Sequence, residues 1–95
     1  MHRMHRAIIT VLGNDRVGII YNVTRVLSEF NINVLDINQT IMAGKTFTMI
    51  MLVDTEAMNA DYKNVVEALT ALGQELGVSI RMQREDVFNA MHSIG

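Results

Sequence analysis

The hydrophobic residues of this chain change their spacing along the sequence, and that change limits the folds open to it. Residues 6–12 (RAIITVL) are rich in β-branched side chains and stop at Gly13, which predicts a strand. From residue 19 the apolar positions follow one face of a helix instead: Ile19, Ile20, Val23, Val26, Leu27 and Phe30. We expect Asn31-Ile32-Asn33 to end this helix, since Asn tolerates the left-handed conformation of many helix ends.

The period returns to that of strands after the first helix. Residues 34–42 alternate, which predicts a strand with one polar face. Its expected apolar face holds Leu35, Ile37 and Ile41, and its polar face holds Asp36, Asn38 and Thr40. Residues 43–45 predict a hairpin turn. Residues 46–53 carry apolar side chains on both faces, so we expect a central strand or one covered by a partner.

A second helix and a fourth strand complete the pattern. An apolar stripe predicts a helix that begins near Tyr62, capped by Asn59 or Asp61, and stops at Gly77. Gly73 lies inside this helix, where it costs about 1 kcal/mol relative to Ala, and we expect it to let the helix approach the sheet closely. Residues 78–83 alternate as a strand, and residues 85–94 predict a short amphipathic helix.

The element order is β-α-β-β-α-β followed by a terminal helix. With right-handed crossovers this order predicts an α+β, ferredoxin-like fold, a four-stranded antiparallel sheet with two helices on one face. We expect one domain over residues 1–95, with residues 1–5 as a flexible extension. The second face of the sheet would then be open, and a second copy or the terminal helix would cover it.

Composition narrows the partners and the cellular location. The chain has no cysteine, so it has neither disulfides nor a thiolate zinc site. Its net charge of -2 is scattered, which disfavours nucleic acid as a partner. No apolar run approaches the roughly 20 residues of a membrane helix, and we see no export signal. We therefore expect a cytoplasmic protein with no membrane partner. The eight methionines favour core packing over an adaptable binding surface.

The turn between the first strand and the first helix holds the candidate binding residues, Asn14, Asp15, Arg16, Val17 and Gly18. Glycines at both ends of the turn let the backbone approach a ligand. Free amides at a helix start bind a carboxylate or phosphate, and Asp15 adds a charge that pairs with an ammonium group. The simpler alternative is that Asp15 only caps the helix. The spacing matches neither a dinucleotide fingerprint nor a P-loop.

Two segments resemble the ACT domain family. They are DRVGII at residues 15–20 and VLSEFNINVLDI at residues 26–37, within a similarity that extends over residues 7–83. The closing segment EDVFNAMH at residues 85–92 resembles the end of small stand-alone ACT proteins of uncharacterised function. The resemblance implies a βαββαβ fold that forms homodimers and often binds amino acids at the subunit interface. If ligand binding changes the dimer, a regulated protein partner can respond to that change.

The resemblance also implies which residues contact a ligand. In ligand-binding relatives the contacts come from the first strand-to-helix turn and from the next helix-to-strand turn. These turns map onto Asp15 and Gly18, and onto Asn33 with Val34 beside it. Many members have Pro where this chain has Val17. The alternative role of Asn33 is capping and turn formation.

We find no catalytic constellation and expect no enzyme activity, cofactor or metal. No histidine is placed near the hydroxyl side chains by any spacing. His2 and His5 have metal-ligand spacing, yet no helix is predicted there and no carboxylate completes the set. His92 stands alone, and Glu85 and Asp86 are interpreted as helix caps. The leading hypothesis is a regulatory module that binds an amino acid or similar metabolite at a dimer interface. The alternative is a ligand-free dimerisation or protein-interaction module.

Overall fold

The computed structural model of the chain describes residues 5–14, 17–42 and 46–92. It contains the expected four strands, two long helices and terminal helix. Their bounds are β1 Arg6–Gly13, α1 Ile19–Glu29, β2 Asn33–Met42, β3 Thr46–Asp54, α2 Tyr62–Leu76, β4 Ser79–Arg84 and α3 Glu85–His92. The hairpin turn expected at residues 43–45 lies outside the described residues, as do Asp15 and Arg16 of the first turn.

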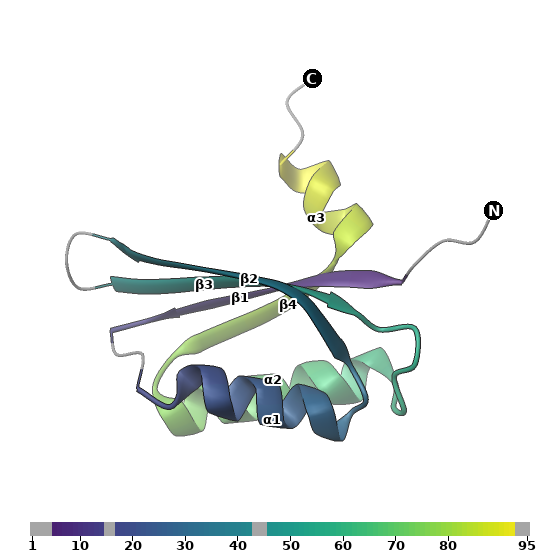
Figure 1. The fold of residues 1–95 in the computed structure, drawn as a ribbon, viewed down its shortest axis with the longest axis horizontal. Coiled ribbons are helices and arrows are strands. Elements are labelled where there is room, and N and C mark those ends of the chain that lie inside the picture. Colours follow the sequence, from purple (N-terminus) through teal and green to yellow (C-terminus); the bar gives the residue numbers. More distant parts are fainter. Residues whose placement is uncertain (1–4, 15–16, 43–45, 93–95) are drawn as a thin grey trace.

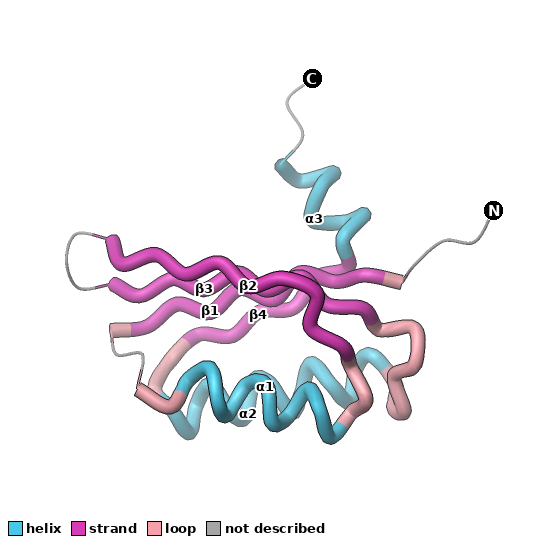
Figure 2. Tube along the Cα trace, in the orientation of Figure 1, coloured by secondary structure: helices cyan, strands magenta, loops and turns pink. Residues whose placement is uncertain are grey.

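The strands form one antiparallel sheet in the order β2-β3-β1-β4. Thus β1 and β3 are central, while β2 and β4 are the edges. Helices α1 and α2 lie on one face of the sheet, and α3 rises from the other (Figures 1 and 2). The ferredoxin-like α+β prediction is therefore confirmed, including the two helices on one face.

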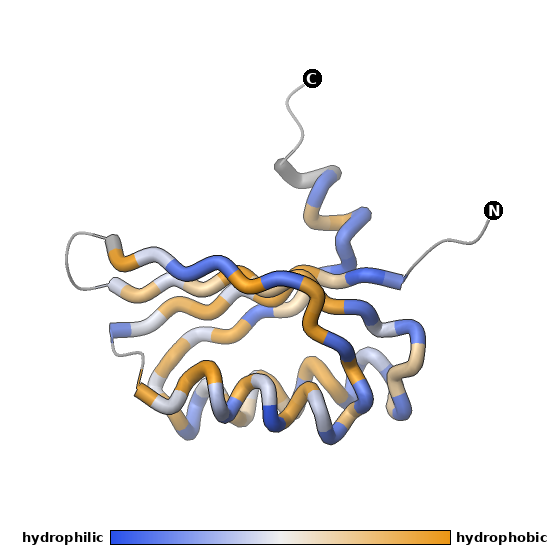
Figure 3. Tube along the Cα trace, viewed as in Figure 1, coloured by the Kyte–Doolittle hydropathy of each residue, from blue (hydrophilic) through white to orange (hydrophobic). Residues whose placement is uncertain are grey.

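The core fills the space between the sheet and the two long helices. From the strands it takes Ala7, Ile9, Val11, Phe47, Met49, Met51, Val53, Ile80 and Met82, and from the helix layer Ile19, Val23, Val26, Leu27, Ile32, Val65, Leu69 and Leu72. Figure 3 shows hydrophobic residues recurring along the strands and along α1, in line with this core. Met49 and Met51 are fully buried. The central strand therefore uses them for packing, which leaves them out of any partner surface.

A β-bulge in β2 overturns one detail of the predicted faces. The register with β3 shifts between Val34 and Asp36, so Leu35 has no place in the regular alternation. Val34 and Ile37 pack against the core, whereas Leu35 is 39% exposed. The expected shared face of Leu35 and Ile37 was wrong because one extra residue changes which side of the strand each later side chain takes.

The helix ends follow the sequence signals with one correction. Asn31 takes the left-handed conformation (φ 60°) after α1, and Gly77 takes it (φ 75°) after α2, as expected. Asp61 is the N-cap residue of α2 but makes no side-chain capping bond. Asn59, the other expected cap, instead donates from its side chain to Glu29 O and from its backbone to Phe30 O, which fixes its loop to the end of α1.

Helix α3 does not lie flat on the open face of the sheet. It packs only against the ends of β1 and β4 among the described elements and projects away from the sheet (Figure 1). Glu85 was interpreted as a cap, but its Oε1 accepts a hydrogen bond of 2.7 Å from Arg6 Nε, tying the start of α3 to the start of β1. No helix in the described part of the chain is long and apolar enough to cross a membrane.

Candidate functional site

The first turn brings Val17 and Gly18 to the start of α1. Gly18 is the N-cap residue, with φ 76° in the left-handed region, and it makes no side-chain capping bond. Asn22 donates from its Nδ2 atom to Gly18 O at 2.7 Å. The first turn of α1 holds no acidic residue, so the positive end of its dipole is not offset from within the helix. Val17 is 82% exposed, and Asn14 is also exposed.

Asn33 and Val34 lie at the other end of the sheet from this turn. Asn33 pairs with Asp54, which pairs with Arg6 at the start of β1. Gly13, beside the first turn, is the last residue of the same strand. One chain therefore does not bring its two predicted binding turns together.

Asn33 borders a small hollow of about 240 Å³, lined by Ser28, Asn31, Ile32, Asn33 and Ala57. Asn31 takes part in its framework, because its Nδ2 atom donates to Ala57 O at 2.9 Å. Asn33 is exposed here, whereas Val34 is half-buried against the core. This volume is below the roughly 300–1,000 Å³ of typical ligand pockets.

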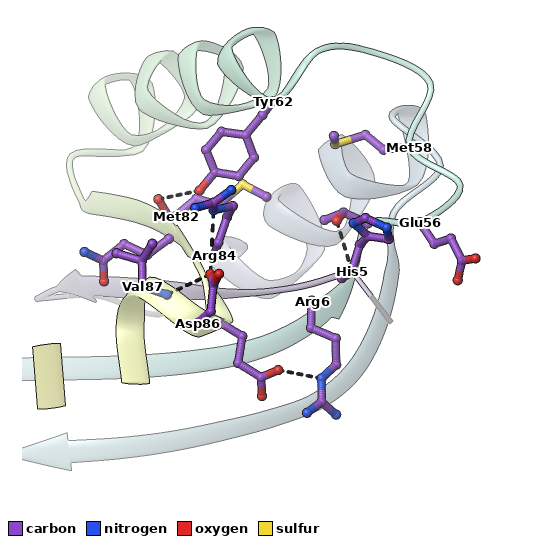
Figure 4. A pocket seen from close by; sticks show the side chains of 12 residues that line it. His5, Arg6, Glu56, Met58, Tyr62, Met82, Arg84, Asp86 and Val87 are labelled. Atoms are coloured by element: carbon purple, nitrogen blue, oxygen red, sulfur yellow. Dashed lines mark hydrogen bonds and ion pairs between the residues drawn. The ribbon is translucent and has the colours of Figure 1, made fainter. Parts of the chain in front are cut away.

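A larger cleft, of about 940 Å³, opens where β1 begins and β4 ends. It is lined by His5, Arg6, Thr55, Glu56, Met58, Tyr62, Met82, Gln83, Arg84, Glu85, Asp86 and Val87 (Figure 4). The start of α2, the loop after β3 and the start of α3 thus meet at one corner of the sheet. Among the described residues, none of those predicted to bind a ligand lines this cleft.

Tyr62 and Met82 form the inner wall of the cleft. The Tyr62 hydroxyl donates to Met82 O at 3.0 Å, which anchors the first residue of α2 to β4. Burial raises the pKa of the Tyr62 phenol, and the nearby Arg84 guanidinium partly opposes that rise. Arg84 therefore lies close enough to the phenol to act on it electrostatically, and Figure 4 shows it between Tyr62 and Asp86.

The alternation of β4 contained a signal for this cleft. Ile80 and Met82 face the core, so Arg84 falls on the same side just where the core ends. Tyr62 belongs to the apolar stripe of α2, but its approach to Met82 spans 20 residues of sequence. Periodicity assigns each residue to a face, and it does not say which faces meet at a corner.

The described residues give no sign of a metal centre. No group of three or more histidine and acidic side chains lies together within residues 5–14, 17–42 and 46–92. His5 borders the cleft, and His2 lies outside the described residues.

Comparison with known proteins identifies the family. A UPF0237 protein of Listeria innocua is 47% identical over 89 residues, which cover 94% of this chain and 99% of the relative. An ACT domain protein from Streptococcus pneumoniae has a solved structure that superposes with a TM-score of 0.78 at 34% identity, covering 90% of this chain and 96% of that one. A protein assigned as a glycine cleavage system transcriptional repressor gives a TM-score of 0.66 at 31% identity, covering 85% of this chain and 46% of that one.

The family model of the ACT domain matches residues 5–83, from the residue before β1 to the penultimate residue of β4. The matched span holds the whole βαββαβ unit, and α3 follows it. On this match, together with the sheet order and the relatives that share nearly their full length with it, the chain belongs to the ACT domain family.

Proposed function

We propose that this chain is a cytoplasmic regulatory module that binds an amino acid or a similar small metabolite between two copies of itself. One observation carries the proposal: the two predicted binding turns lie at opposite ends of one sheet, whose edge strand β2 is free to pair with a second copy. A site that uses both turns therefore needs a second chain. ACT domains generally bind small ligands in regulatory proteins, which supports this interpretation.

A twofold pairing of β2 with its copy would complete the site. In an antiparallel pair the Asn33 end of one strand lies opposite the Met42 end of the other. The Met42 end of β2 lies at the same end of the sheet as the first turn. Met42 pairs with Thr46, and the adjacent Ile41 pairs with Phe47, which in turn pairs with Gly13 beside the turn. The first turn of one copy would then lie near Asn33 of the other.

The two turns offer complementary chemistry for an amino acid. The amides at the start of α1 suit a carboxylate, because they carry the positive end of the helix dipole. We assign the ammonium group to Asp15, and a further hydrogen bond to the side-chain amide of Asn33. Arg16, Val17 and Asn14 complete the turn, and Val34 lies beside Asn33 on β2. A ligand held this way would stabilise the paired state, and a protein partner would respond to that change.

Isothermal titration with each of the common amino acids tests the proposal, with light scattering to follow association. We expect heat of binding for a subset of amino acids and a ligand-dependent increase in the dimer fraction. Asp15→Ala and Asn33→Ala should both weaken binding. Asn64→Ala is the matched control, since Asn64 is an exposed asparagine on α2, away from both turns. Binding that survives both site variants unchanged would refute the assignment.

The alternative function is a ligand-free interaction module. The open face of the sheet favours it, because Leu12 and Ile50 are 43% and 39% exposed there. Under this alternative, dimers form without any small molecule and no amino acid raises the melting temperature. An Ile50→Lys variant would then weaken association, whereas Asn33→Ala would leave it unchanged.

A further inference from the structure

The cleft between α2, β4 and α3 has an apolar side and a charged side. Its apolar side consists of Met58, the Tyr62 ring, Met82 and Val87. Thioether and aromatic groups form a polarizable surface that accepts aliphatic or flat ligands. Met82 is 8% exposed and belongs to the core, so the cleft continues the core to the surface. Its volume of about 940 Å³ is enough for a small organic molecule.

Arg84 is the cation at this cleft that is most available for a ligand. Its closest carboxylate contact among the described residues is Asp86, with Nε and Oδ1 separated by 3.6 Å, and both side chains are about two-thirds exposed (65% and 68%). An exposed pair at that separation contributes little. A carboxylate that accepts two parallel hydrogen bonds from a guanidinium forms a stronger pair. A bound carboxylate could therefore displace this loose contact.

The acidic side chains around the cleft are engaged or directed elsewhere. Glu85 forms a 2.7 Å bond with Arg6, so the two charges offset each other. Asp86 Oδ1 accepts a 2.8 Å bond from the backbone amide of Val87. Figure 4 shows the Glu56 side chain pointing away from Arg84, and His5 across the cleft from it. These positions leave Arg84 and His5 as hydrogen-bond donors on opposite sides of the opening.

We propose that this cleft binds a small organic carboxylate. Arg84 pairs with the carboxylate, and the apolar part of the ligand lies against Met58, Met82 and the Tyr62 ring. The site is separate from the proposed amino-acid site: Gly18 lies beyond the opposite end of β1, and Asn33 lies on edge strand β2, with β3 and β1 between it and β4. It lies within one chain and does not depend on dimerisation.

Probes of similar shape and opposite charge, followed by amide NMR, test this site. Phenylacetate and hexanoate are titrated into the full-length protein, with phenethylamine and hexylamine as probes of similar shape and opposite charge. We expect both carboxylates to shift the backbone amides of Gln83 and Val87 in a saturable manner at millimolar concentration. The amines should leave those amides unchanged. Equal effects of amines and carboxylates, or shifts centred on Gly18, would overturn the proposal.

Two arginine variants show whether Arg84 carries the binding. Arg84→Gln should weaken carboxylate binding by at least about tenfold, because it removes the charged fork. Arg81→Gln is the matched control: Arg81 is an exposed arginine on the same strand, placed on the open face away from the cleft. Circular dichroism checks that both variants fold. Equal affinity of the two variants would refute the role of Arg84. Full affinity in Val87→Asp, which adds a carboxylate to the apolar wall, would refute the placement of the ligand in this cleft.

Discussion

Replacing Gly73 with alanine should destabilise this protein, although a change from glycine to alanine in an ordinary helix interior stabilises the helix. A Cβ atom built at Gly73 would lie 2.7 Å from Val78 O and 3.4 Å from Ile80 Cγ1. The Gly73 carbonyl also accepts hydrogen bonds from the amides of Gly77 and Val78. The added methyl therefore meets the backbone of a turn that is already held in place, and α2 or β4 must move.

The size of the effect follows from two opposing contributions. Alanine gains about 1 kcal/mol of helix propensity over glycine. Overpacking a close-packed site costs about 1–3 kcal/mol, and an obstacle made of backbone places Gly73 in the upper part of that range. We therefore expect the free energy of unfolding to fall by about 1–2 kcal/mol. The melting temperature should fall by about 4–8 °C for each kcal/mol lost.

Urea denaturation of Gly73→Ala and of Ala71→Gly measures both contributions. Ala71 is an exposed residue of the same helix, so Ala71→Gly reports the propensity difference without a steric change. Gly77→Ala provides a second comparison, because Gly77 has φ 75° with nothing within 4 Å of the new Cβ, and its cost reflects backbone conformation alone. If Gly73→Ala proves more stable than the parent by the amount that Ala71→Gly loses, the close contact with β4 does not constrain the fold.

Three further changes test the start of α1 and the corner of the cleft. Gly18→Ala should cost about 1–2 kcal/mol in urea denaturation, since its φ of 76° suits glycine; an unchanged stability would show that the turn relaxes. Tyr62→Phe should cost about 1 kcal/mol by removing the 3.0 Å hydrogen bond to Met82 O. Folding raises the pKa of the Tyr62 phenol, so the parent protein should lose stability as the pH rises above 10.0, the usual pKa of a tyrosine. Denaturation at several pH values should show that Tyr62→Phe lacks this part of the loss. A double-mutant cycle of Arg6→Gln and Glu85→Gln should give a coupling of about 0.5–1 kcal/mol that shrinks with added salt; zero coupling at low salt would mean that this contact does not hold α3.

Local pattern and local conformation predict most of the fold. The stripe of α1 and the alternation of β3 recur as buried faces, because each period fixes which residues share a side. Asn31 and Gly77 mark helix ends because few other residues adopt positive φ easily. The predicted face of Leu35 was wrong because a bulge depends on how β2 pairs with β3, and the sequence of a single strand does not reveal that pairing.

The candidate sites depend on contacts between distant residues, so sequence reasoning reached them only in part. The first turn is local, and its glycine conformation agrees with the sequence expectation. The distance between that turn and Asn33 follows from strand register, which pairs Asn33 with Asp54 rather than placing it near Gly18. The cleft joins Arg6 to Glu85 across 79 positions, and no spacing rule extends that far.

The two edges of the sheet differ in length, and this difference determines how copies of the chain can assemble. A chain whose β2 joined the β4 edge of a neighbour would leave one free edge at each end, and such head-to-tail growth forms filaments. Here a strand of ten residues would meet one of six, so much of the longer edge would remain without backbone hydrogen bonds. Pairing of β2 with β2 leaves no such overhang, and that twofold contact closes with two chains. Inserting residues to lengthen β4 should therefore favour fibres over closed pairs.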